Sequence, residues 1–157
     1  MKTGTDSDAG LVDLTTAAPT TVANLRILTP PSELPQINRI TPTETTVFIV
    51  SAELTGYKLE DDSDIHLILT DGSGNTMITE IPAPHCVGSS SPFKDMIANA
   101  RAEFDAKYSP QTVFTTVAVP IKVKGVGFFD FLHGQEGVAP NGIELHPVLD
   151  VTFPPTA

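Results

Sequence analysis

The chain has 157 residues, 40% of them hydrophobic, and carries a formal net charge of −10 from 19 acidic and 9 basic side chains. This length and apolar content predict one folded domain with a buried core. No run approaches the roughly 18 apolar residues of a membrane-spanning helix, so we expect no membrane span. The acidic balance argues against nucleic acid as a partner, because nucleic-acid binding needs a basic surface. A single cysteine excludes an internal disulfide framework and a cysteine-rich zinc site.

The first segment, residues 1–43, is rich in threonine and proline and has no sustained periodicity. It is predicted to be an irregular arm or linker ahead of a single β-barrel domain over residues 44–154. Leu25, Ile27 and Leu28 are the residues that can hold this arm against the domain. No apolar stretch of signal-peptide type follows the initial charge. Flexible tethers of this kind are common at the start of exported domains after signal removal, so an exported protein is expected, with a cytoplasmic one as the alternative.

Five segments carry the β-branched or alternating pattern of strands: 45–57, 65–70, 76–81, 113–129 and 143–153. A glycine-rich turn joins the second segment to the third, as in a hairpin.

One helix is predicted between the third and fourth strands. Ser91 is a suitable N-cap, and apolar residues from Phe93 to Phe104 recur at helical spacing. The order of elements predicts a mainly β fold, a five-stranded OB-fold-like Greek-key barrel with one α-helix between strands 3 and 4. A β-sandwich with one helical crossover is the competing architecture.

Two blocks of sequence form a distinctive pattern. The first contains DSDIHLILTD (62–71), TMITEIP (76–82) and Cys86, and the second is GVGFFDFLHGQEGVAPNGIELHPVLDV (125–151). Together they resemble a group of uncharacterised bacterial proteins, often exported, over roughly residues 45–153. The resemblance implies a fold and brings no known activity with it.

Histidines and carboxylates are predicted to meet on the outer face of the barrel. The strand alternation points His66, Glu144 and His146 outward, and Glu80 shares their side. In an OB topology the third strand lies beside the second and the fifth, so these side chains can converge. Two imidazoles and a carboxylate suit zinc or iron, so His66, Glu144 and His146 are predicted ligands of a divalent metal. The alternative is that all four are solvent-facing polar residues, with the histidines bonded to loop carbonyls.

The loop 131–142 borders the face on which OB-folds bind their ligands. Its glycines allow a close approach, and His133, Gln135 and Asn141 are the predicted ligand-binding residues. His133, or Glu80 on the third strand, is the candidate catalytic proton carrier. The alternative is a turn-rich loop whose polar side chains bond to its own backbone.

The turn formed by Glu60, Asp61, Asp62 and Asp64 offers oxygen ligands of the kind calcium prefers. It lacks the glycine and terminal glutamate of an EF-hand, so a solvated acidic turn is expected. Cys86 is expected to be a buried, inert thiol.

These patterns favour a small acidic binding or accessory module for a small molecule, peptide or saccharide. The alternative is a metal-dependent hydrolase of phosphodiesterase or nuclease type, with His66, Glu144 and His146 as ligands. A second alternative is a structural or protein-interaction domain. Whether the protein is an enzyme stays open at this stage.

Overall fold

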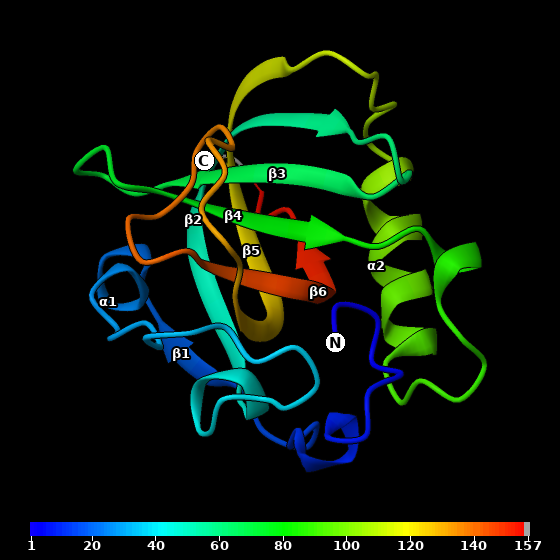
Figure 1. The fold of residues 1–157 in the computed structure, drawn as a ribbon. Coiled ribbons are helices and arrows are strands. Elements are labelled where there is room, and N and C mark those ends of the chain that lie inside the picture. The colour runs from blue at the N-terminus through cyan, green and yellow to red at the C-terminus, as the bar shows by residue number, and fades with distance from the viewer. Residues whose placement is uncertain (156–157) are drawn as a thin grey trace.

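A computed structural model describes residues 1–155 (Figure 1). The strands and α-helices in chain order are β1 (Ala18–Thr20), α1 (Val22–Arg26), β2 (Val47–Leu59), β3 (Ile65–Thr70), β4 (Thr76–Ile81), α2 (Lys94–Asp105), β5 (Thr115–Phe129) and β6 (Ile143–Thr152). Short 3-10 turns cover Ala9–Leu11, Thr43–Thr45 and Pro84–Cys86. The bounds predicted for β3 and β4 are correct, because a hairpin turn and a proline mark their ends.

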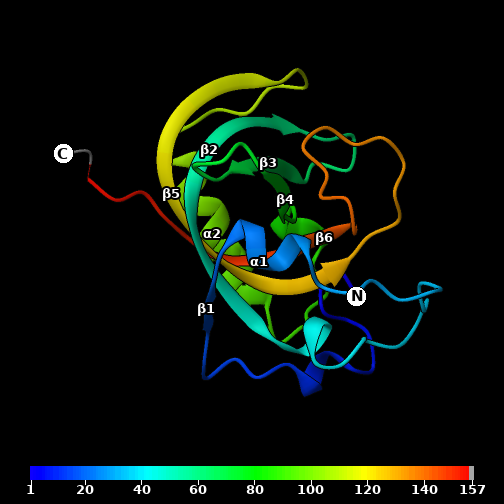
Figure 2. The ribbon, with the colours of Figure 1, turned by 90° about the vertical axis from the view of Figure 1, so that its left-hand side faces the viewer.

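The described residues are mainly β, and six strands among them form one mixed sheet that closes on itself (Figure 2). The strand order is β1-β2-β3-β4-β6-β5, and β2 also pairs with β5, which completes a ring of hydrogen bonds. Within the ring β4 and β6 run parallel, and the other neighbours run antiparallel. Closure leaves few unpaired strand edges, which would otherwise invite pairing with other chains.

The arm predicted to be irregular contributes two elements of its own. β1 pairs in parallel with the start of β2, and α1 follows directly, with the Thr21 hydroxyl accepting a hydrogen bond from the Asn24 amide. Val22 and Leu25 are almost completely buried in the main core, whereas Ile27 is 80% exposed. The structure therefore has six strands and two α-helices, where the sequence predicted five strands and one helix. Segments this short have too few residues to display a period.

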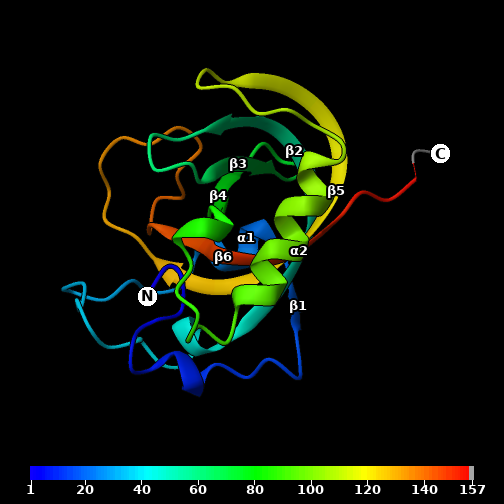
Figure 3. The same cartoon turned by 90° about the vertical axis from the view of Figure 1, so that its right-hand side faces the viewer.

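The two helices lie at opposite ends of the ring (Figures 2 and 3). Phe93, Ile97, Ala100 and Phe104 on or beside α2 have no solvent exposure, and α2 packs mainly against β6. The helix and the residues of α1 thus fill the ends of the core. Within residues 1–155, no helix has both the length and the apolar character that crossing a membrane requires.

Candidate functional site

Three adjacent strands place polar side chains on the outer face of the ring. Along β3, Ile65, Leu67 and Leu69 are fully buried in the core, so the intervening His66 lies on the other face. His66 is the register partner of Glu80 on β4. β4 lies between β3 and β6, and its register with β6 brings Glu144 alongside.

Glu80 contacts both histidines of this face. Its Oε1 lies 3.3 Å from Nδ1 of His66, and its Oε2 lies 3.4 Å from Nδ1 of His146. Oε1 of Glu144 is 3.1 Å from the same Nδ1, so two carboxylates meet at this nitrogen. The four residues that the strand alternation placed on one side of the sheet are therefore in contact.

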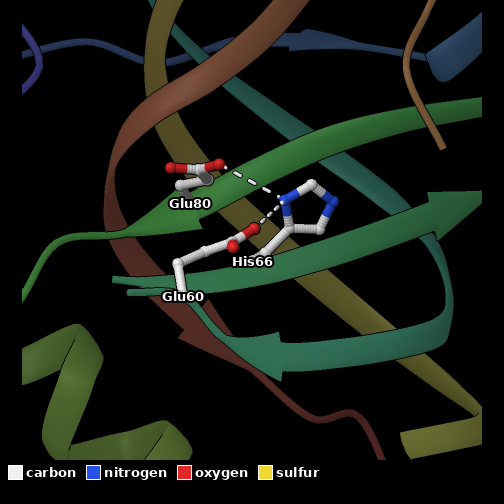
Figure 4. A group of neighbouring side chains, drawn as sticks. All are labelled: Glu60, His66 and Glu80. Atoms are coloured by element: carbon white, nitrogen blue, oxygen red, sulfur yellow. Dashed lines mark ion pairs between the residues drawn. The ribbon is translucent and has the colours of Figure 1, made fainter. Parts of the chain in front are cut away.

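The acidic turn supplies two further carboxylates. Oε1 of Glu60 lies 3.1 Å from Nδ1 of His66 (Figure 4), and Oδ2 of Asp64 lies 3.6 Å from Nε2 of His146. Asp64 is 8% exposed, and its other oxygen accepts a hydrogen bond from the Ala83 amide. The expectation of a solvated turn is therefore wrong for Asp64. The signal in the sequence was its position two residues before His66, which puts both on the same face of the strand.

Both histidines are buried, so the alternative of solvent-facing side chains is wrong in their exposure, although His66 does bond to a loop carbonyl as that alternative expected. His66 is 2% exposed and His146 is not exposed at all. The Glu136 carbonyl lies 3.0 Å from Nε2 of His66. A carbonyl can only accept, so this nitrogen carries the proton and donates. In the neutral ring the Nδ1 lone pair then faces Glu60 and Glu80.

His146 has one ring nitrogen without a hydrogen bond. Among the described residues its Nε2 is completely buried and finds no hydrogen-bond partner, since the Asp64 oxygen is 3.6 Å away. Buried polar atoms in native proteins are nearly always paired, so an unpaired one calls for an explanation such as an ion or water.

Burial and charge act against each other on these groups. Burial alone would lower the pKa of His146, but the nearby Asp64 and Glu144 carboxylates outweigh it and raise the pKa to about 9. For His66 burial is likewise outweighed by Glu80 and the Glu136 carbonyl, which raise its pKa. Burial raises the pKa of Glu144. The site therefore attracts positive charge, whether protons or a metal ion.

A cavity of about 280 Å³ opens onto this cluster. It is lined by Lys2, Glu60, Asp61, Asp62, Glu80, Asp130 and His133. His133 lies at its edge, with Nε2 3.9 Å from Oδ2 of Asp130, and Lys2 is 3.4 Å from the same oxygen. Solvent and a ligand can thus reach Glu60 and Glu80 from this side.

The other two predicted ligand-binding residues are occupied by backbone groups. Asn141 donates hydrogen bonds to the carbonyls of Leu25 and Leu28, each at 2.9 Å, and so ties the loop to α1. The side-chain oxygen of Gln135 accepts from the His133 amide, and its nitrogen donates to the Phe131 carbonyl. Of the three, His133 alone lines the cavity.

Cys86 is exposed, contrary to the prediction of a buried thiol. It ends the short 3-10 turn Pro84–Cys86, in which none of the three residues is buried. The neighbouring prolines make this segment irregular, so it shows no helical or strand periodicity from which the burial of Cys86 could be predicted.

Comparison with known proteins identifies no family for this chain. No protein-family model matches the sequence, and no curated protein matches it. Among solved structures, the chain is similar to Entamoeba histolytica asparaginyl-tRNA synthetase in complex with asparaginyl-adenylate, with 11% sequence identity and a TM-score of 0.44. The match covers 79% of this chain and 25% of the synthetase chain. A similarity of this size carries no argument about either fold or function.

Proposed function

We propose that this protein is a metal-dependent hydrolase, with the histidine–carboxylate cluster as its metal site. The observation that carries the proposal is the position of Glu80 between two buried histidines at an open cavity. We further propose that β2, β3, β4, β6 and β5 form an OB-like Greek-key barrel. The strand order and the parallel pairing of β4 with β6 support it.

The donor atoms suit a first-row transition metal. Imidazole nitrogen together with carboxylate oxygen is a set that binds Zn²⁺, Fe²⁺ or Mn²⁺, whereas Ca²⁺ takes oxygen alone. The Glu136 carbonyl holds the His66 ring in the orientation usual for a metal-binding histidine, whose second nitrogen donates to a fixed acceptor.

The separations between donor atoms also favour a shared cation. Two ligands at about 2.1 Å from one metal ion lie about 3.0–3.4 Å apart, from octahedral to tetrahedral geometry. The contacts of Glu60 and Glu80 with His66 are 3.1 and 3.3 Å. Charge-assisted N–H···O hydrogen bonds are shorter, about 2.7–2.9 Å. The separations in the cluster are therefore compatible with the ligand shell of an ion.

We propose hydrolysis because water and a substrate can reach the metal site through the cavity. A metal ion held by Glu80 with one of the two histidines and the carboxylate beside it, Glu60 at His66 or Asp64 at His146, would polarise the substrate and lower the pKa of a water molecule next to it. His133, at the edge of the same cavity, is the proposed proton carrier. Glu80, predicted from the sequence as an alternative proton carrier, is assigned instead as a ligand because it contacts both histidines.

A ligand-binding module without catalysis is the second candidate. A hollow of about 400 Å³ adjoins the acidic cavity and shares Lys2 and Asp130 with it. Leu34, Pro35 and Phe131 contribute apolar surface there. This surface favours a small molecule or peptide with an apolar part beside a metal-binding group.

Elemental analysis of the purified protein, followed by hydrolysis assays, tests the proposal. We expect bound metal, and metal-dependent turnover of at least one of four substrate classes: phosphodiester, phosphomonoester, carboxyl ester or glycoside. Glu80→Gln should lose both, and His85→Ala, which changes an exposed histidine, should lose neither. Metal without turnover would favour the binding module. Absence of metal even after incubation with Zn²⁺, Mn²⁺ and Fe²⁺ would overturn the proposal.

A further inference from the structure

The cluster divides into two overlapping sets of ligands. Glu60, His66 and Glu80 form one set, and Asp64, Glu80 and His146 form the other. In each set the ligand atoms all lie within 4.8 Å of one another. Glu80 belongs to both, and it faces the two histidines with different oxygens, Oε1 toward His66 and Oε2 toward His146.

In the first set, three electron-pair donors point at one another. With the His66 proton on Nε2, the lone pair on Nδ1 faces Oε1 of Glu60 at 3.1 Å and Oε1 of Glu80 at 3.3 Å. Such an arrangement is repulsive unless a proton on Nδ1 or a metal ion lies among the three atoms, and a metal ion can replace that proton. Glu60 and Glu80 also line the cavity, so this position can exchange its ligands with solvent.

In the second set, the signal is the unpaired nitrogen of His146. This side chain is completely buried, and its Nε2 has no hydrogen-bond partner among the described residues while it faces Asp64. Asp64 is held in place by the Ala83 amide, 3.0 Å from its Oδ1. Glu144, itself 2% exposed, adds a carboxylate 3.1 Å from the other ring nitrogen of His146.

The charge of the cluster can accommodate two divalent ions. Four carboxylates converge here, those of Glu60, Asp64, Glu80 and Glu144, and all are at least partly buried. Lys2 is the basic side chain among the cavity residues, and it is paired with Asp130. Buried charge is costly unless compensated. In the metal-free protein, protons on the two histidines compensate part of it, and two divalent cations would equal the charge of the four carboxylates.

We propose that the site binds two divalent cations bridged by the carboxylate of Glu80. One ion is held by Glu60 and His66, and the other by Asp64 and His146 with Glu144 beside it. The inference rests on the proposed function and specifies its chemistry. Paired ions of this kind clamp the attacking and leaving oxygens in the hydrolysis of phosphate esters, so the proposed substrate class is a phosphoester.

The experiment counts Mn²⁺ ions on the metal-free protein by equilibrium dialysis and records their electron paramagnetic resonance spectrum. We expect two ions per chain and the broad, multi-line signal of a spin-coupled pair. Glu60→Gln and Asp64→Asn should each reduce the count to one and leave the six-line signal of an isolated ion. Both variants keep an oxygen acceptor, so the hydrogen bond that the Ala83 amide donates can persist in Asp64→Asn. Glu103→Gln, which changes an exposed carboxylate on α2, should keep two ions.

The outcomes separate the two proposals. Zero ions would overturn the metal site and with it the proposed function. One ion in the unaltered chain would overturn the two-ion centre and leave a single-metal hydrolase standing. Two ions with an uncoupled spectrum would overturn the bridge through Glu80. Two ions that persist in both the Glu60 and Asp64 variants would overturn the location of the centre.

Discussion

His66 and Glu80 are register partners on β3 and β4, and Oε1 of Glu80 approaches Nδ1 of His66 to 3.3 Å. Cross-strand partners on one face of an antiparallel pair lie close enough for their side chains to interact directly. The second oxygen of Glu80 reaches His146 on the other neighbouring strand. A single carboxylate on the central strand thus connects the two outer ones.

Replacing Glu80 should therefore damage metal binding more than any other single change in the cluster. Glu80→Gln keeps the size of the side chain but offers one oxygen and no charge. Loss of an outer-shell partner costs about 10–100-fold in metal affinity, so loss of this shared ligand should cost at least about 100-fold. Calorimetric titration of the metal-free protein with Zn²⁺ measures it. An affinity within threefold of the unaltered chain would contradict the assignment of Glu80.

Metal binding should also stabilise the fold. An ion present at 100 times its Kd contributes about 2.7 kcal/mol. In a domain of this size that corresponds to a rise in Tm of about 5–10 °C. The measurement is thermal unfolding with EDTA, and again after Zn²⁺ is restored in excess. The same shift in a His146→Ala protein would show that the ion binds elsewhere.

Without metal, stability should fall as the pH rises above neutral. The pKa of His146 is raised to about 9 in the folded chain, against about 6.5 when unfolded. A raised histidine pKa stabilises the fold fully below pH 6.5, and this contribution is lost as the pH rises through about 9. The raised pKa of Glu144 acts in the same direction.

Urea unfolding in EDTA between pH 6 and pH 9.5 measures this dependence. The midpoint concentration should fall over the interval, and His146→Asn should flatten the fall. His85→Asn, an exposed histidine for comparison, should leave the curve unchanged. A midpoint that rises with pH in the metal-free protein would contradict the direction of the shift.

The sequence predicted side-chain direction correctly in strands long enough to show hydrophobic alternation. Alternation along β3 and β6 assigned His66, Glu144 and His146 to one face, because each side chain in a strand points opposite to its neighbours. Contact between them depends on which strands are adjacent, and this followed from the expected strand order. The contact of Glu80 with both histidines could not be predicted, because it depends on the register of β4 with β3 and β6.

Glu60 shows why the rest of the site could not be predicted. It lies in a turn, where no periodicity relates sequence position to direction, whereas Asp64 stands two residues before His66 and shares its face. The turn folds back so that the Glu60 amide donates to the Asp64 carbonyl at 2.8 Å, and Ser63 adopts a φ of 69°. Serine seldom adopts this left-handed backbone conformation, so the composition of the turn did not indicate its shape. The burial of Leu25 was likewise decided by tertiary packing and by Asn141, more than 100 positions away.

The arm should contribute measurably to stability through Leu25. This side chain is 1% exposed within the main core, so Leu25→Ala should lower the free energy of unfolding by about 2–5 kcal/mol. Ile27, two positions on, is 80% exposed, and Ile27→Ala should change it by no more than about 0.5 kcal/mol. Urea unfolding of both variants measures the difference. Equal effects would mean that the arm does not pack as described.

The loop that carries Glu136 should tune metal binding through Gly137. Gly137 has a φ of +81°, and a Cβ placed there would lie 2.8 Å from Cγ2 of Ile68. Gly137→Ala must therefore displace the loop whose Glu136 carbonyl accepts the hydrogen bond from His66. We expect metal affinity to fall about 10-fold or more, as for loss of an outer-shell partner.

Gly134 provides the matched control for this substitution. It has a φ of +82°, and a Cβ added there would meet no atom within 4 Å, so Gly134→Ala carries the same left-handed backbone cost, about 1–2 kcal/mol, without the clash. Both alanine variants should thus lose similar backbone stability, while Gly137→Ala alone binds Zn²⁺ more weakly in calorimetric titration. If both bound Zn²⁺ as tightly as the unaltered chain, the Glu136 carbonyl would have no part in orienting His66 for the metal. If both were weakened equally, general loosening of the loop would account for the loss.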